Sequence, residues 1–364
     1  MKKKILLITN HSYMFWRFRK ELVEELLKDH EVIISTPFVG HEKDLEALGC
    51  RMVETTVNRR KIDPVTELRL LAFYLRLLRR EKPDLVITYS IKPNTYGGIA
   101  CRLARVPYCI NVQGLGTAFQ KQGIAQAASL LYRLACRKAR TVFFENEESA
   151  QIFREKGITP AARQTVLPGA GINLETYTYA PYPENDATHF LYLGRFMKEK
   201  GMDELLYAAK QLHKRYGSKV VLDLVGFFED EYKDQINALI DEGCAVFHGF
   251  QTDPRPYYAM ADCVVLPSHH EGLSNVLLEA AAMGRPVITN DISGCMEAVI
   301  PGKSGLLCAV KDRESLLTAM DTFMNMSRED REAMGRQGRT YMAEFEKRKV
   351  VQMTLEAIFA CEHS

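Results

Sequence analysis

Two glutamates stand eight positions apart in the segment HHEGLSNVLLEAAAMG, residues 269–284. Glu271 directly follows His269 and His270, and Glu279 lies within a run of apolar residues. Carboxylates and imidazoles in such a pattern could hold a metal ion, act as an acid and a base, or bind a polar ligand. Which chemistry is available depends on where the secondary structure places these side chains.

A helix is expected to begin just after Glu271. Ser274 or Asn275 suits the N-cap, Gly272 permits a tight turn, and VLLEAAAM contains strong helix formers. Glu271 should therefore lie in a loop and Glu279 about one turn into the helix, so the two carboxylates do not share a helical face. Besides the glutamates, the candidate ligand contacts are the residues at the helix start: Gly272, Leu273, Ser274 and Asn275.

This geometry disfavours two of the three chemistries. A glycosidase-like carboxylate pair must flank one bond from opposite sides. Adjacent histidines do not naturally face one ligand, and no H-E-x-x-H pattern follows. The segment instead favours a cradle for a polar anionic ligand at a helix N-terminus, and we expect no metal ion and no cofactor.

A second candidate loop is GRFMKEKG, residues 194–201. Gly194 lets the backbone approach a ligand, Arg195 can hold a phosphate with two hydrogen bonds, and Lys200 supplies a mobile point charge. Taken alone, the two cations could simply be solvated. Because both loops follow predicted strands of the same sheet, we expect them to form one anion site.

The elements that position these loops alternate along the chain. Short β-branched runs are separated by longer helical patterns such as residues 202–216, which is typical of βαβ units and parallel sheets. The predicted strands span residues 4–9, 31–36, 84–90, 108–112, 141–145, 189–194, 219–226, 245–249, 262–268, 286–291 and 305–309.

The chain of 364 residues is longer than one hydrophobic core usually supports. We expect an α/β fold of two Rossmann-like, doubly wound domains facing a central cleft. The predicted divisions are a first domain at 1–170, a linker rich in Gly, Pro, Asn and Thr at 171–188, and a second domain at 189–340. The last helix, 341–364, either covers the second sheet or crosses back to the first domain.

Composition sets the remaining bounds. The chain is 46% hydrophobic and 26% charged with a formal net charge of +2, which argues against a nucleic-acid partner. The nine cysteines contain no C-x-x-C pair and favour buried thiols in a reducing compartment. No apolar run reaches the ~18 residues of a spanning helix, and MKKKILLIT lacks a following cleavage site. We therefore expect a cytoplasmic protein, peripheral on the inner membrane.

GRFMKEKG followed by PSHHEGLSNVLLEAAAMGRPVI resembles the donor site of glycosyltransferase family 4, the retaining nucleotide-sugar transferases of GT-B fold. GINLETY, residues 171–177, resembles the family's entry into its second domain. The resemblance implies that Arg195 and Lys200 bind the donor diphosphate, that Glu271 faces the donor sugar, and that Glu279 holds the ribose. It also implies retention of anomeric configuration without a metal ion.

Within the family, the first-domain segments resemble a bacterial subgroup that builds capsular, exopolysaccharide or lipid-linked glycans. This implies transfer of a hexose or N-acetylhexosamine from a nucleotide sugar, with UDP favoured, to a polyprenyl diphosphate-linked saccharide. Phe250, after the predicted strand AVFHG, is a candidate wall of the base pocket.

TYSIKPNTYGG, residues 88–98, and NVQGLGTAF, residues 111–119, should line the first domain's side of the cleft. Many family members carry a histidine at the end of the fourth strand, where this chain has Tyr89, Ser90 and Ile91, so that role is left unassigned. NHSYMFWRFRK replaces the family's first glycine loop. The candidate acceptor or phosphate contacts are Arg19, Lys92, Asn94, Gly114 and Gly116.

An anionic membrane surface is the expected partner of two basic segments. FWRFRK, residues 15–20, mixes aromatics with cations, and residues 58–82 contain eight Lys or Arg against three Asp or Glu. In this second segment we expect Leu68, Leu71, Leu75 and Leu78 to face the core, leaving Phe73, Tyr74 and Leu77 beside arginines. That pattern favours an interfacial helix over a solvated basic one.

Two other functions compete with sugar transfer. An epimerase or hydrolase acting on a nucleotide sugar could use the same fold, but it would need acid and base groups beyond Glu271. A partner that keeps the fold without turnover is disfavoured by the presence of Arg195, Lys200, Glu271 and Glu279.

Overall fold

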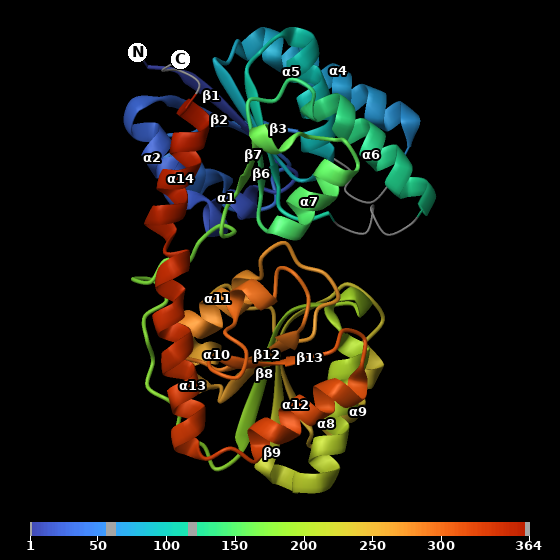
Figure 1. Ribbon diagram of the computed structural model, residues 1–364, viewed down its shortest axis with the longest axis vertical. Helices are drawn as coiled ribbons and strands as arrows, with labels where there is room; N and C mark the ends of the chain where they lie inside the picture. Colours follow the sequence, from blue (N-terminus) through green and yellow to red (C-terminus); the bar gives the residue numbers. More distant parts are fainter. Residues whose placement is uncertain (1, 56–62, 116–121, 361–364) are drawn as a thin grey trace. The chain divides into compact units, whose positions relative to one another are not determined.

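The computed structural model describes residues 2–55, 63–115 and 122–360. The chain divides into two compact units (Figure 1). The first comprises Met1–Ala170 together with Arg348–Ser364, and the second comprises Gly171–Lys347.

The first unit is built on a seven-stranded parallel sheet of order β3-β2-β1-β4-β5-β6-β7. The order reverses between β1 and β4, which makes this the topological switch point of the unit. The strands are β1 Lys4–Ile8, β2 Glu31–Thr36, β3 Arg51–Glu54, β4 Leu85–Tyr89, β5 Tyr108–Val112, β6 Val142–Phe144 and β7 Gln164–Val166. The predicted strands here are all present, while β3 and β7 were not foreseen.

Helices cover both faces of this sheet. Buried side chains of α4, α5, α6 and α7 share one core cluster, and those of α1, α2, α3 and α14 share another. The elements are α1 Ser12–Phe18, α2 Lys20–Asp29, α3 Glu42–Ala47, α4 Pro64–Glu81, a π-helical turn Pro93–Gly97, α5 Gly98–Ala104, α6 Gln122–Cys136, α7 Glu147–Glu155 and a short 3₁₀ turn Ala161–Arg163.

The buried face of α4 differs from the expected leucine stripe. Leu68 is 67% exposed, whereas Tyr74 and Leu77 are buried. The face is set by Glu67, Leu70, Tyr74, Leu77, Leu78 and Glu81, which recur at three- and four-residue steps. Leu78 is buried as predicted, and Leu71 and Leu75 pack partly buried on the same core, but the prediction was wrong for Leu68. Glu67 and Glu81 are buried instead, and each is paired with a cation.

The second unit is built on a six-stranded parallel sheet of order β10-β9-β8-β11-β12-β13. Its switch point lies between β8 and β11. The strands are β8 Thr188–Phe196, β9 Val220–Phe228, β10 Ala245–Gly249, β11 Cys263–Leu266, β12 Val287–Asn290 and β13 Gly305–Cys308. All six were predicted, and the parallel α/β architecture of both units is confirmed.

One large core cluster runs through the second unit and includes side chains from its strands and surrounding helices. The elements are α8 Met202–Tyr216, α9 Lys233–Asp241, α10 Arg255–Met260, α11 Asn275–Ala282, α12 Arg313–Met324 and α13 Arg328–Tyr341, with 3₁₀ turns at Lys198–Lys200, Gly217–Lys219, Met296–Ala298 and Met342–Phe345.

The segment expected to link the domains is held on the second unit. Arg285 is fully buried, and its guanidinium donates to the backbone carbonyls of Ala180 and Pro181. Arg339 donates to the carbonyls of Tyr177 and Ala282, each at 2.7 Å. A buried guanidinium requires such acceptors, and here they are the carbonyls of irregular backbone.

The last helix, α14 Lys347–Phe359, returns to the first unit after α13 (Figure 1). Val350, Val351 and Ile358 are buried in the cluster that contains Ile5 and Leu7 of β1. At its start, the backbone of Ile172 bonds Phe345 and Lys347, with N···O distances of 2.7 and 2.9 Å. The two points at which the chain passes between the units, near Ile172 and near Lys347, are therefore neighbours.

Candidate functional site

The GRFMKEKG segment starts inside β8 rather than after it. Gly194 has φ +156°, and a β-carbon on its cross-strand neighbour Gly226 would lie 1.7 Å from the Gly194 carbonyl oxygen. The glycine pair thus allows β8 and β9 to approach closely at their carboxyl ends. Arg195, the next residue, has an exposed guanidinium whose Nη1 lies 2.6 Å from Glu229 Oε2, at the end of β9.

The two predicted loops meet at the β8/β11 switch point. The His269 amide donates to the Glu199 carbonyl at 2.9 Å. A β-carbon on Gly201, which has φ +72°, would lie 2.0 Å from the Pro267 carbonyl oxygen. Such a contact is too close for any side chain, so glycine is required for the loops to pack together.

Lys200 and Glu271 are brought into direct contact. Lys200 Nζ lies 2.5 Å from Glu271 Oε1, and both side chains are largely buried. The charge of Glu271 also reaches two neighbours, because it adds to burial in raising the pKa of Tyr192 and of Cys295. Glu271 is therefore a fixed carboxylate in a low-dielectric environment, with its second oxygen available to a ligand hydroxyl.

Helix α11 begins where expected. Ser274 is its N-cap and accepts from the Leu277 amide, while its own amide donates to the Gly294 carbonyl at 2.8 Å. Leu273 is buried, and Gly272 and Asn275 are partly exposed beside it. The first turn presents backbone N–H groups and the positive end of the helix dipole at the same sheet edge as Arg195 and Lys200.

Glu279 lies just over one turn into α11 and is 3% exposed. Its Oε2 accepts a hydrogen bond of 2.9 Å from the hydroxyl of Tyr258, which is fully buried. Glu271 and Glu279 thus occupy different environments, as their spacing indicated.

The neighbouring histidines take separate positions. His269 is buried, with Nε2 3.1 Å from Glu204 Oε1 on α8, whereas His270 is exposed. Within the described ranges, no group of three or more His, Cys, Asp or Glu side chains is arranged to hold a metal ion.

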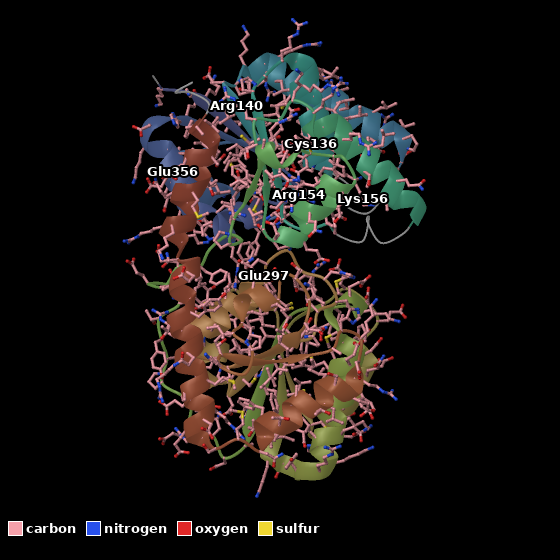
Figure 2. All side chains as sticks on the ribbon, viewed as in Figure 1. Cys136, Arg140, Arg154, Lys156, Glu297 and Glu356 are labelled. Atoms are coloured by element: carbon pink, nitrogen blue, oxygen red, sulfur yellow. The ribbon has the colours of Figure 1, made fainter. Side chains whose placement is uncertain are left out.

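A third loop completes the site and was missed from the sequence. Residues 291–298 follow β12, and Glu297 (labelled in Figure 2) accepts from the Ser293 hydroxyl and the Gly294 amide at 2.8 and 2.5 Å. A β-carbon on Gly294, at φ +86°, would lie 2.5 Å from the Gly272 carbonyl oxygen. The signal was the short SG pair after a buried strand, which could have marked this loop.

Phe250 follows β10 at the edge of the same sheet. It is 55% exposed and contacts Phe227 edge to face, with ring centroids 6.0 Å apart. An exposed aromatic pair at the carboxyl ends of β9 and β10 can stack against a planar ligand.

Two candidate residues of the first unit, Arg19 and Asn94, are buried and have partners within that unit. Arg19 is 3% exposed and pairs with Glu145 at 2.7 Å. Asn94 is also buried, accepts from the Thr88 hydroxyl and donates to the Asn111 carbonyl, so it ties β4 to β5. Both side chains thus have structural contacts within the first unit, and their predicted contact with a ligand stays a prediction.

Lys92 follows β4, and its side chain is largely buried. Its Nζ lies 2.6 Å from Glu67 Oε1, and Ser90 just before it adopts a left-handed conformation at φ +73°. Gly114 is partly exposed after β5, and Gly116 lies outside the described residues.

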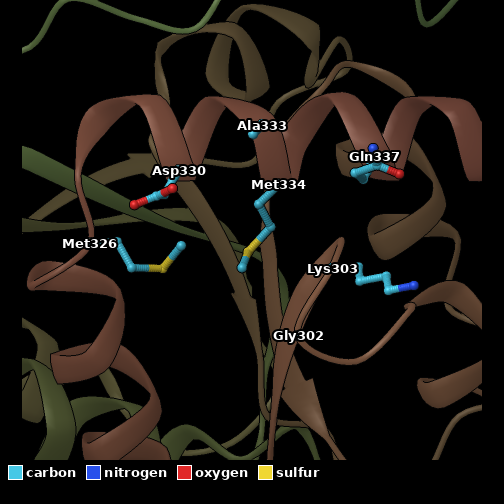
Figure 3. Close-up of a pocket in the computed structure, with 7 residues that line it drawn as sticks. All are labelled: Gly302, Lys303, Met326, Asp330, Ala333, Met334 and Gln337. Atoms are coloured by element: carbon cyan, nitrogen blue, oxygen red, sulfur yellow. The ribbon is translucent and has the colours of Figure 1, made fainter.

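A pocket of about 450 Å³ lies elsewhere in the second unit (Figure 3). It is formed by α13, the loop between α12 and α13, and the turn before β13. Because that turn precedes the strand, the pocket is at the opposite edge of the sheet from the loops that contain Arg195 and Glu271. Its lining residues are Gly302, Lys303, Met326, Asp330, Ala333, Met334 and Gln337.

The eight cysteines in the described part of the chain are free and buried. Across the same residues, no helix combines the length and the apolar character needed to cross a bilayer.

Comparison with known proteins assigns both units. A model of the glycosyl transferase 4-like domain matches residues 16–170, and a model of glycosyl transferases group 1 matches residues 181–341. The structure of Anabaena HepE in complex with UDP and glucose superimposes with a TM-score of 0.81, at 19% identity, over 98% of this chain and 99% of that one.

Two bacterial enzymes are similar over most of their length. The N,N'-diacetylbacillosaminyl-diphospho-undecaprenol alpha-1,3-N-acetylgalactosaminyltransferase of Campylobacter jejuni is 25% identical over 86% of this chain and 87% of its own. The UDP-Gal:alpha-D-GlcNAc-diphosphoundecaprenol alpha-1,3-galactosyltransferase of Escherichia coli is 26% identical over 72% and 71%. With matching domains in both units and a GT-B fold, the chain belongs to the family 4 glycosyltransferases.

Proposed function

We propose that this glycosyltransferase moves a hexose or N-acetylhexosamine from a UDP-linked donor to a polyprenyl diphosphate-linked saccharide, with retention of anomeric configuration and without a metal ion. The observation that carries the proposal is the convergence of Arg195, Lys200, Glu271 and the α11 N-terminus at one switch point. The names of the Campylobacter and Escherichia relatives support the donor and acceptor classes.

The residues suit departure of a nucleoside diphosphate. When the bond between the sugar C1 and the β-phosphate oxygen breaks, negative charge develops on the diphosphate. Arg195, Lys200 and the N–H groups of α11 are already in place to stabilise this charge, so little reorganisation is needed. Two fixed cations and a helix N-terminus can fulfil the electrostatic role that a divalent ion has in other transferases.

Glu271 and Glu279 would then hold the two ends of the donor. Glu271 accepts from Lys200 through one oxygen and would accept a sugar hydroxyl through the other. Glu279, oriented by Tyr258, would accept from the ribose. The acceptor hydroxyl attacks C1 from the face that the diphosphate leaves, and its proton passes to the departing phosphate oxygen.

The test is release of nucleoside diphosphate from a panel of nucleotide sugars, with and without a membrane lipid extract and with and without EDTA. We expect release from a UDP-sugar that depends on lipid and is unaffected by EDTA. The configuration of the product at C1, read by NMR, should match that of the donor. Conversion of the sugar without any acceptor would instead support the epimerase or hydrolase alternative, which no observation favours.

Association with an anionic membrane follows from a lipid-linked acceptor, and it would place the protein on the cytoplasmic face of the inner membrane. Neither basic segment keeps its expected form, because Phe15 and Arg19 are buried and so are Tyr74 and Leu77. Any membrane contact must therefore use side chains other than these buried ones.

A further inference from the structure

The outer sides of α4, α5 and α6 form a face of the first unit that is rich in cations, and the exposed carboxylate described there is Asp63, the N-cap of α4. Residues 85–144 contain neither Asp nor Glu. In α4 the two glutamates, Glu67 and Glu81, are buried and paired with basic side chains. The basic residues on this face are Arg69, Arg76, Arg79, Arg80, Arg102, Arg105, Arg133, Arg137 and Lys138.

Large apolar side chains are exposed among these cations. Leu103 of α5 is 59% exposed, and Leu130 and Leu134 of α6 are 53% and 38% exposed. α5 and α6 are joined at this face, because Arg102 Nη1 donates to the Leu134 carbonyl at 3.0 Å. Leu68 of α4 is exposed as well, at 67%.

We infer that this α4–α6 face is a docking surface for a bilayer rich in anionic lipid, an inference that rests on the lipid-linked acceptor proposed above. The charge asymmetry is local, since the whole chain has a net charge of only +2. Cations attract the anionic surface, and leucines between them insert at the boundary of headgroups and acyl chains. A soluble polyanion such as RNA would use the arginines and leave the leucines exposed, which disfavours it.

Two sets of substitutions test the face by cosedimentation with vesicles of phosphatidylcholine alone or mixed equally with phosphatidylglycerol. The wild type should bind only the mixed vesicles, and less at high salt. R105Q/R137Q/K138Q should bind at least tenfold more weakly, because each cation near an anionic surface contributes about threefold to fivefold. L103Q/L130Q/L134Q should also bind several-fold more weakly at unchanged charge.

K214Q/R215Q/K219Q, on exposed positions of the second unit, is the matched control and should bind like the wild type. The assignment would be overturned if R105Q/R137Q/K138Q or L103Q/L130Q/L134Q bound the mixed vesicles as tightly as the wild type. It would also be overturned if the wild type did not bind them. UDP binding, measured in parallel without lipid, should be unchanged in all variants. If the wild type does not bind UDP at all, that result would contradict the proposed function and not the membrane role of this face.

A second inference concerns Glu229, which no motif had marked. Its loop is fixed to the Arg195 loop, because the amides of Glu229 and Asp230 both donate to the Phe196 carbonyl at 3.1 Å. Asp230 in turn accepts from the Lys198 amide at 2.9 Å. The Glu229 carboxylate is 19% exposed and lies 2.6 Å from Arg195, so its position beside the guanidinium is built into the fold.

We propose that Glu229 is a counter-ion of Arg195 that competes with the donor diphosphate and limits how tightly the diphosphate is held. The pairs Arg195–Glu229 and Lys200–Glu271 each carry no net charge. A diphosphate that binds the same guanidinium must lie near the Glu229 carboxylate, and the repulsion weakens its binding. The same repulsion favours release of the nucleoside diphosphate product. This inference rests on the proposed role of Arg195.

E229Q should bind UDP about fivefold to tenfold more tightly than the wild type in calorimetry, because glutamine can still accept from Arg195 while the negative charge is removed. The gain should shrink at high salt. E242Q is the matched control and should leave UDP affinity unchanged, since Glu242 forms a 2.6 Å pair with Lys210 in the same unit.

Unchanged or weaker UDP binding by E229Q would overturn the counter-ion role and leave Glu229 as a residue that only positions Arg195. Failure of the wild type to bind UDP, GDP or ADP would overturn the proposed donor site, and this inference with it. E229A should separate the two roles further, because it removes both the charge and the hydrogen-bond acceptor.

Discussion

At the scale of single residues, each cation predicted to contact an anion is already paired with a carboxylate. The partners are distant in sequence, so no motif could reveal them. Arg195 and Glu229 are 34 positions apart, and Lys200 and Glu271 are 71 apart. The sequence identified the basic residues through their loops, whereas their pairing depends on which strand ends are neighbours in the sheet. The pairs are Arg19 with Glu145, Lys92 with Glu67, Arg195 with Glu229 and Lys200 with Glu271.

The predicted site residues differ in how deeply they are buried. Arg19 and Asn94 were chosen by type and position, and the structure shows that each also has partners inside the first unit. Lys200 and Glu271 lie at a strand-to-helix turn where a ligand can displace or share their contact. Residue type therefore predicted where cations lie, whereas only the packing shows which carboxylate each cation contacts.

K200A and E271Q should each lower transfer by at least a hundredfold, because each removes a preorganised charge from the transition state. The fold should persist in both variants, as far-UV circular dichroism would show, although loss of a largely buried ion pair lowers the thermal stability. K210A, which breaks an exposed pair of similar length with Glu242, is the control and should keep full turnover. Near-normal turnover in either site variant would contradict the site assignment.

At the scale of elements, buried strands were predicted well and edge strands were not. β3 and β7 contain only four and three residues, and neither has a fully buried side chain. A short strand with few apolar residues shows no alternating or continuous apolar pattern in the sequence. The sheet still needs such a strand, because it pairs with the otherwise open edge of its neighbour. The prediction for α4 was imprecise for the opposite reason, because the helix has many leucines and more than one set of them fits a helical period. The buried side includes two glutamates, which an apolar pattern does not reveal.

Three neighbouring strands share one buried carboxylate. Asp223 of β9 is 1% exposed and accepts from His189 of β8 and His248 of β10, each at 2.7 Å. The hydrogen bond to Asp223 is the main cause of the raised pKa of His189, and the charges of Asp223 and Asp262 add to it. Protonated His189 is thus stabilised in the folded state relative to the unfolded chain.

The resulting pH dependence can be measured on H189Q. The contribution of charged His189 is fully present below its unfolded pKa of about 6.5 and is lost as pH rises through the raised folded pKa. H189Q should therefore lower the free energy of unfolding by about 1 kcal/mol more at acidic than at alkaline pH. Urea unfolding at several pH values measures this, with H41Q at an exposed His–Asp pair as the control. A constant difference across pH would contradict it.

At the scale of the whole molecule, the first unit is discontinuous in sequence. The second unit is a single stretch, Gly171–Lys347, whereas the first needs both Met1–Ala170 and α14. Burying Val350, Val351 and Ile358 contributes about 1.5–3 kcal/mol each, which together approaches the total stability of a typical domain.

The two fragments should therefore behave differently. Residues 171–347 alone should unfold cooperatively, with dispersed amide resonances in NMR and affinity for UDP. Residues 1–170 alone should lack a cooperative transition, because β1 and α2 lose the cover of α14. Adding a synthetic peptide of residues 346–364 should restore it in part. A stable, cooperative fragment 1–170 would contradict the importance of α14.

The return of α14 also has a consequence for synthesis of the chain. A ribosome makes residues 1–170 first, yet the core beside Ile5 and Leu7 lacks Val350 and Ile358 until the very last helix emerges. All of the second unit has by then been translated and can close its own core. The first unit thus begins to be synthesised before the second but completes its core after it. During translation, the apolar surface that α14 later covers stays exposed, and this is where a chaperone would bind.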